Sequence, residues 1–148
     1  MNINLIKCYL ALSLILLLLG CENTELQSRL DSIIVEVEGN EFHWTFRYPG
    51  VDGVLGNDDD QYSQQNLFLP DHSEITLKLV SKDYVYSFAL PDLGLKEIAV
   101  PDLEFNLNFN TKSEQTLLLL GDQFCGYSHK TLIGKVYVRN QNNGFYGW

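Results

Sequence analysis

Residues that bind metals or carry redox chemistry are scarce in this chain of 148 residues. It has three cysteines, one methionine and three histidines. Cys8 is expected to leave with an N-terminal signal peptide and Cys21 to carry lipid, so Cys125 is the sole free thiol of the expected mature protein. An intramolecular disulfide is therefore excluded. Cys125 is a buried core residue, a metal ligand or a reactive thiol.

Basic residues are also few. The chain has 10 Lys and Arg against 19 Asp and Glu, and its formal net charge is −9. An acidic surface disfavours nucleic acid and anionic lipid headgroups as partners. Two interpretations remain: the acids steer basic partners toward the protein, or they only keep it soluble.

Motifs of the common enzyme classes are missing. There is no nucleophile elbow, no His-Glu-x-x-His pair and no glycine loop for phosphate. Cys125 and His129 could form a nucleophile pair, but no residue pattern marks an oxyanion hole or a third, orienting group. We therefore expect no catalytic residues and no activity of the chain alone.

Helical periodicity is absent, whereas alternation of apolar and polar residues is common. Turn signals recur at roughly 8–12 residues, which predicts an all-β sandwich or barrel. An acidic loop with no apolar period is predicted from Pro49 to Gln61, with Asp58, Asp59 and Asp60 solvated because they lack the ligand spacing of an EF-hand. The expected strands cover residues 33–38, 42–48, 67–69, 75–79, 84–90, 98–100, 103–109, 116–120 and 134–138.

The N-terminal segment predicts export and a lipid anchor. An apolar run over residues 8–19 is shorter than the roughly 20 residues of a spanning helix. It ends in Leu18-Leu19-Gly20-Cys21, which resembles the bacterial lipoprotein cleavage box. We expect a signal peptide at 1–20 and lipid on Cys21, placing the protein in the bacterial cell envelope, facing the periplasm. The alternative is an uncleaved anchor helix.

Three further segments follow in the predicted organisation. Residues 21–31 form a lipidated tether, 32–140 the β domain and 141–148 an aromatic tail. The tail begins with the turn signal Asn142-Asn143-Gly144 and ends with Phe145, Tyr146 and Trp148. These side chains either pack along a sheet edge or contact a partner.

Four stretches of the predicted domain carry a family resemblance. They are residues 37–49 (VEGNEFHWTFRYP), 66–70 (NLFLP), 81–96 (SKDYVYSFALPDLGLK) and 125–129 (CGYSH). In this order they are similar to the aromatic stretch, the short strand, the Ser-x-Asp-Val-x-His-Ser-Phe segment and the Cys-Gly-x-x-His loop of haem-copper (cytochrome c) oxidase subunit II. The resemblance implies a Greek-key cupredoxin-like β-sandwich for the domain.

The resemblance also shows which copper ligands are missing. The family's domain holds a binuclear copper centre, CuA, which passes electrons from cytochrome c toward haem in subunit I. Only Cys125 and His129 match its ligands. Two bridging thiolates hold the two copper ions together, so one cysteine cannot build this centre. The other ligand positions, and the position of the tryptophan through which electrons enter, are occupied by Tyr86, Gly121, Gln123, Leu132 and Phe42.

A single copper ion remains an alternative. Cys125 and His129 could bind it with Tyr86 as an extra ligand, and Asp83 or Asp122 could add a carboxylate. Tyr86 could instead fill the vacated space with its hydroxyl group on His129. His43 and His72 are expected at the surface because they lie on a polar strand face and in a turn.

These observations lead to three hypotheses of function. The first is a non-catalytic accessory subunit of a respiratory oxidase-like complex, with subunit I as the expected partner and no cofactor. The second is a mononuclear copper protein for electron transfer or copper delivery through Cys125 and His129. The third is a free-standing lipoprotein without an oxidase partner.

Overall fold

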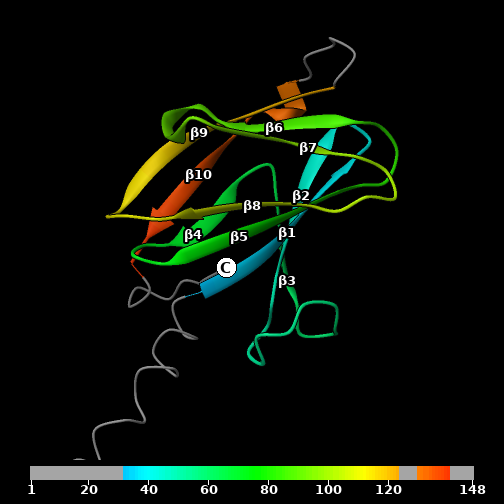
Figure 1. Cartoon of the computed structure of the whole chain (residues 1–148). Coiled ribbons are helices and arrows are strands. Elements are labelled where there is room, and N and C mark those ends of the chain that lie inside the picture. Colours follow the sequence, from blue (N-terminus) through cyan, green and yellow to red (C-terminus); the bar gives the residue numbers. More distant parts are fainter. Residues whose placement is uncertain (1–31, 124–129, 141–148) are drawn as a thin grey trace, which may run out of the picture. The chain divides into compact units, whose positions relative to one another are not determined.

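We describe residues 32–123 and 130–140 of a computed structural model of the chain (Figure 1). The predicted signal peptide, the tether, Cys21, Cys125, His129 and the aromatic tail lie outside these residues. Within the described part of the chain, no helix is sufficiently long and apolar to cross a membrane.

The first sheet has five strands in the order β3-β2-β1-β5-β8. Neighbouring strands are antiparallel except β1 and β5, which run parallel and place Val35 opposite Leu77. The strands cover Ser32–Asn40 (β1), His43–Tyr48 (β2), Gln61–Gln64 (β3), Glu74–Ser81 (β5) and Phe105–Asn110 (β8).

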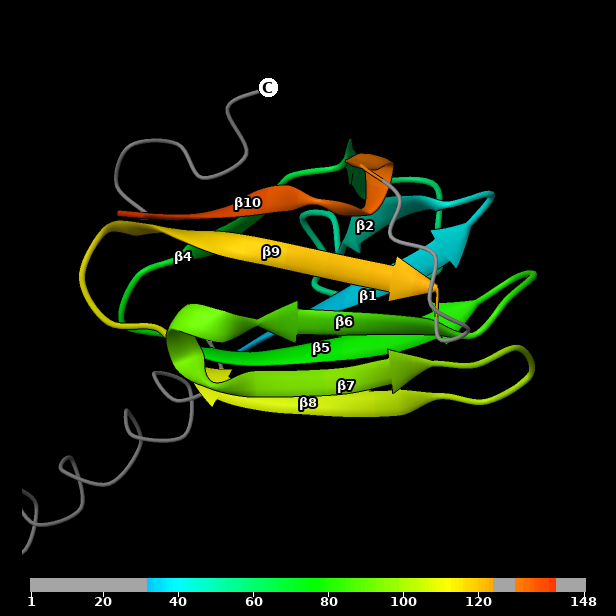
Figure 2. The same ribbon diagram turned by 90° about the horizontal axis from the view of Figure 1, so that it is seen from above.

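The second sheet also has five strands, in the order β4-β10-β9-β6-β7. Here β4 and β10 are the parallel pair. Figure 2 shows β9 between β10 and β6. The strands cover Leu67–Pro70 (β4), Tyr86–Leu90 (β6), Leu95–Ala99 (β7), Gln115–Gln123 (β9) and Gly134–Arg139 (β10), and short 3-10 turns cover Pro91–Leu93 (η1) and Lys130–Leu132 (η2).

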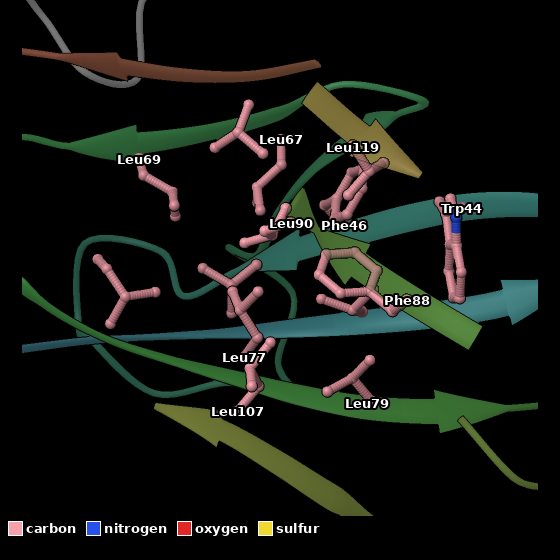
Figure 3. Packing of buried hydrophobic residues seen from close by; sticks show 14 of the residues in the cluster. Trp44, Phe46, Leu67, Leu69, Leu77, Leu79, Phe88, Leu90, Leu107 and Leu119 are labelled. Atoms are coloured by element: carbon pink, nitrogen blue, oxygen red, sulfur yellow. The ribbon is translucent and has the colours of Figure 1, made fainter. Parts of the chain in front are cut away.

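The core lies between the inner faces of the two sheets. Successive residues of a strand point to opposite faces, so alternate apolar residues are buried together. Figure 3 shows Leu67, Leu69 and Leu119 of the second sheet facing Leu77 and Leu107 of the first. Burying each such side chain contributes roughly 1.5–3 kcal/mol. Burial of these alternating apolar side chains therefore holds the two sheets together.

The predicted all-β sandwich is confirmed, with local corrections. Strand β3 was not predicted, because its residues QYSQ have no apolar alternation and lie next to the acidic loop. Strand β7 begins at Leu95, earlier than expected, and β8 begins only at Phe105, leaving Leu103 exposed. Phe42 lies in the turn before β2 because β1 continues to Asn40.

Candidate functional site

The described positions that the resemblance assigns to copper ligands come from separate segments and meet at one end of the second sheet. In the β6–β9 pair, Tyr86 lies opposite Gln123 and Phe88 lies opposite Gly121. The carbonyl oxygen of Leu132, from η2, lies beside Gly121. The loop with Cys125 and His129 joins Gln123 to Lys130 and lies outside the described residues.

Gly121 has no room for a side chain. A Cβ atom at this position would lie 2.5 Å from Nε1 of Trp44 and 2.9 Å from the carbonyl oxygen of Leu132. These two groups hold each other in place, since Trp44 Nε1 donates a 3.1 Å hydrogen bond to the Leu132 oxygen. Trp44 is fully buried. The space beside position 121 is therefore occupied by an indole ring with a satisfied N–H group.

Tyr86 is fully buried, and its hydroxyl group is engaged within the described residues. It donates a 2.7 Å hydrogen bond to Oδ1 of Asp83 and accepts a 3.2 Å bond from the backbone N–H of Phe42. Burial, together with the Asp83 carboxylate, raises the pKa of Tyr86 to about 12. The phenol is therefore neutral at physiological pH, and its single proton is committed to Asp83.

Asp83 fastens the turn between β1 and β2. Glu41 and Phe42 both adopt positive φ angles, of 49° and 62°, which are uncommon for residues other than glycine. The second carboxylate oxygen of Asp83 accepts a 2.7 Å hydrogen bond from the Glu41 N–H. Burial alone would raise the pKa of Asp83, but hydrogen bonds from Tyr86 and from the Glu41 and Tyr84 N–H groups lower it overall. Asp83 is thus an ionised anchor for this turn.

Aromatic rings pack around this turn. Phe42 stacks on Tyr84 with ring centroids 5.2 Å apart and meets the edge of Tyr86 at 6.2 Å. Trp44 in turn contacts Tyr86 at 5.6 Å and Phe88 at 5.4 Å. Offset and edge-to-face contacts of this kind add about 0.5–1.5 kcal/mol each beyond area burial. The site end of the sandwich is therefore filled by aromatic side chains.

The residues at these positions do not fit a binuclear copper centre. Gly121 offers no side-chain donor atom, and Leu132 has no sulfur and its carbonyl oxygen is bonded to Trp44. The Tyr86 hydroxyl is bonded to Asp83. Across residues 32–123 and 130–140, no group of three or more His, Cys, Asp or Glu side chains is placed to hold a metal ion. Asp122, weighed as an additional ligand, is exposed.

The two described histidines lie at the surface, as predicted. His43 is exposed, with Nδ1 2.8 Å from the carbonyl oxygen of Glu41. The His72 side chain is 73% exposed and lies 3.2 Å from Oδ2 of Asp71.

The prediction that the acidic run is exposed to solvent is wrong for Asp60. This side chain is buried and binds Arg47 of β2 and the backbone N–H groups of Gly56 and Asn57. Burial opposes ionisation, but the bonds from Gly56 and Arg47 outweigh it and lower the pKa of Asp60. The sequence signal for this contact was Arg47, a cation on the polar face of its strand. The contact could not be predicted, because the sequence does not show that β2 pairs with β3.

Comparison with known proteins finds similarity to cytochrome c oxidase subunit 2 proteins. No family model matches the chain. It is 26% identical to the alternative cytochrome c oxidase subunit 2 of Bradyrhizobium diazoefficiens over 140 residues, which covers 80% of this chain and 50% of the relative. It is 29% identical to cytochrome c oxidase subunit 2 of Bacillus subtilis over 127 residues, covering 80% of this chain and 32% of the relative. The chain thus spans a third to a half of the length of these relatives.

A solved structure shows the same fold. The periplasmic domain of subunit II of cytochrome oxidase from Bradyrhizobium japonicum superimposes with a TM-score of 0.63 at 17% identity, covering 75% of this chain and 86% of that domain. The resemblance to the subunit II periplasmic domain and the cupredoxin-like fold are therefore both confirmed.

Proposed function

We propose that this chain is a lipid-anchored, periplasm-facing cupredoxin domain that serves as a non-catalytic accessory subunit of a respiratory oxidase-like complex. The proposal starts from its similarity to cytochrome c oxidase subunit 2 proteins. Lipid on Cys21 would hold it at the membrane. Its role would be to dock on a haem-copper subunit rather than to receive electrons.

The closed space at Gly121 carries this proposal. A bridging thiolate at position 121 would need the volume that the Trp44 indole and the Leu132 carbonyl occupy. Core packing at native density leaves no slack for such a group without displacing one of these neighbours. The hydrogen bond between Trp44 and Leu132 makes that displacement costly, because it would leave buried polar atoms without partners. These contacts support a domain that keeps the fold without the binuclear centre.

Purification of the tagged full-length chain from native membranes tests the accessory role. We expect a haem-copper oxidase subunit to co-purify, seen as haem absorbance and by mass spectrometry. The control is a tagged lipoprotein that carries the same residues 1–31 on an unrelated domain. Failure to recover a haem-copper subunit, or its equal recovery with the control, would contradict the proposal and favour a free-standing lipoprotein.

Copper loading tests the absence of a metal role. The full-length chain is incubated with Cu(I) and with Cu(II), and retained metal and the visible spectrum are measured. We expect no tightly retained copper. About one equivalent of copper per chain that is lost in the Cys125→Ser variant would overturn the proposal in favour of the mononuclear copper protein.

A further inference from the structure

Four strands form the edges of the two sheets: β3 and β8 in the first sheet, and β4 and β7 in the second. An edge strand is paired on one side, so about half of its backbone N–H and C=O groups face outward, where another strand can bind them. Proteins commonly block such edges with short strands, prolines, charged residues or covering groups. The four edges of this protein differ in how they are blocked.

Three of the edges have features that hinder strand pairing. Strand β3 has only four residues and follows the acidic loop. Strand β4 also has four residues and ends at Pro70, and β7 contains Lys96 and Glu97. On β4, the Phe68 N–H donates a 2.9 Å hydrogen bond to the Tyr48 hydroxyl group. These three strands are therefore short, charged or covered.

Strand β8 has none of these features. With six residues it is the longest of the edge strands, and its sequence FNLNFN contains no charge and no proline. Figure 2 shows β8 at one side of the sandwich, next to β7. Within residues 32–123 and 130–140 it pairs only with β5. The outward edge of β8 can therefore accept a further strand.

The sequence of β8 is complementary to itself in an antiparallel arrangement. In a pair centred on Asn108, Asn106 of one copy lies opposite Asn110 of the other, and all three asparagines are exposed. Leu107 lies opposite Phe109 on the other face of the strand. An amide side chain both donates and accepts hydrogen bonds, so asparagine can pair with asparagine. Pairing of β8 with a second β8 thus matches polar with polar and apolar with apolar side chains.

Charges beyond the two ends of β8 support the same alignment. Glu104 and Lys112 are both exposed and are equally distant in sequence from Asn108, so each Glu104 faces the Lys112 of the other copy. Glu104 holds Lys78 through Oε2 at 2.8 Å. Among the residues that the structure describes, Lys112 has no acidic partner. Because each copy has a net charge of −9, an uncharged strand with opposite charges at its ends is a favourable place for two copies to meet.

We propose that two copies of this chain associate through β8, which forms an antiparallel pair with the β8 of the second copy about a two-fold axis at Asn108. The two five-stranded first sheets thereby join into one continuous sheet. Such a symmetric contact uses the same surface on both copies. This inference is independent of the oxidase partner.

Cross-linking between introduced cysteines tests the alignment of the two strands. The full-length chain carries Cys125→Ser and is treated with a short bifunctional thiol reagent. We expect Asn108→Cys to give a cross-linked dimer, because side chains directly opposite each other have Cβ atoms about 4.5–5.5 Å apart. Asn106→Cys and Asn110→Cys should give a dimer only when the two variants are mixed, since two copies of position 106 lie about 13 Å apart along the strands.

Two results of the cross-linking would overturn the proposal. They are the absence of a dimer with Asn108→Cys and a dimer formed by Asn106→Cys alone. The chain with Cys125→Ser and no introduced cysteine is the control for any cross-link through Cys8 or Cys21.

Sedimentation of the full-length chain over a range of concentrations tests the contact without a cross-link. We expect a monomer–dimer equilibrium, and Asn108→Lys should raise its dissociation constant at least several-fold, because the two lysines would lie opposite each other. The matched control is Gln64→Lys, since Gln64 is exposed on β3 at the other edge of the same sheet. It should leave the dissociation constant unchanged.

A parent chain that stays monomeric at every concentration would overturn the proposal. A dimer that Asn108→Lys and Gln64→Lys affect equally would also overturn it, in favour of a contact elsewhere on the surface. Far-ultraviolet circular dichroism verifies that each variant is folded.

Discussion

Trp44 and the Leu132 carbonyl leave space only for glycine at position 121. We expect Gly121→Ala to lower the free energy of unfolding by about 1–3 kcal/mol, as overpacking in a filled core does, because its Cβ would lie 2.5 Å from the indole nitrogen. Gly121→Cys should lower the free energy of unfolding further, because its side chain is larger. Urea unfolding followed by circular dichroism measures both changes.

A double-mutant cycle identifies the cause of the Gly121 effect. Trp44→Phe removes the nitrogen that the new Cβ would meet, so Gly121→Ala should cost less in that background. Equal costs in the two backgrounds would show that Trp44 does not limit the space.

The Tyr86 hydroxyl group offers a second prediction at the level of one residue. Tyr86→Phe removes a donor to Asp83 and an acceptor for the Phe42 N–H, and should cost about 1–2 kcal/mol of unfolding free energy. The control is Tyr84→Phe, which alters a tyrosine that is 46% exposed and should cost little.

The same variant has a spectroscopic signature. When absorbance at 295 nm is followed during alkaline titration, the Tyr86→Phe variant should lack the ionisation of one tyrosine with a pKa of about 12. Since folding raises this pKa above the usual 10.0, the stability that Tyr86 contributes is present below pH 10 and is lost as the pH rises toward 12. A parent chain whose tyrosines all titrate near pH 10 would contradict the assignment.

The sequence indicated which described positions correspond to copper ligands, but not the contacts among them. The resemblance placed Tyr86, Gly121 and Leu132 at one site, and the structure brings these positions together. The partner of the Tyr86 hydroxyl was expected to be His129 if the tyrosine filled the vacated space. Within the described residues Asp83 accepts this proton, because the bend after Ser81 returns the carboxylate to the strand that follows, and His129 lies outside the described residues. Such a short-range bond depends on side-chain geometry that a residue pattern does not contain.

The β1–β2 turn is predicted to depend on a residue outside it. Asp83→Ala should destabilise the protein by about 1–3 kcal/mol at pH 7, because Tyr86 and the Glu41 N–H lose a charged acceptor. Folding lowers the pKa of Asp83, so its contribution is present above the usual value of 3.8 and is lost as the pH falls through the lowered value. Denaturation curves of parent and variant should therefore converge in acid.

The loop between β2 and β3 is predicted to depend on Asp60 in the same way. Asp60→Asn weakens the pair with Arg47 and should open residues 50–60 to limited proteolysis at pH 7. Because the pKa of Asp60 is also lowered by folding, the difference should fade as the pH falls below 3.8 and through that lowered value. Asp58→Asn is the control, since Asp58 is exposed. Equal cleavage of both variants would refute the role of Asp60.

Strands with an apolar face were predictable, and strands without one were not. Residues of β5 alternate so regularly that Ile75, Leu77 and Leu79 identify the buried face directly. Strand β3 has no apolar face, because its one buried residue, Ser63, is polar. That strand exists because its backbone pairs with β2. Tertiary pairing thus defines elements that local pattern leaves undetermined.

At the scale of the whole molecule, the expected lipid anchor makes a prediction about location. Cys21→Ala removes the thiol that would carry lipid, so the variant should no longer partition into detergent in Triton X-114 extraction, whereas the parent should. Cys125→Ser is the matched control because it removes a different thiol. A Cys21→Ala protein that remains in the detergent phase would instead support an uncleaved anchor helix.

The two parallel strand pairs also bear on how the protein folds. Strand β1 needs β5, and β4 needs β10, the last strand of the described chain, so each sheet is completed by contacts between distant segments. Closing such long loops before contacts form slows folding. The second sheet cannot be completed until residue 139 is available, because β4 joins it only through β10. A chain emerging N-terminus first therefore stays incompletely folded until β10 has emerged.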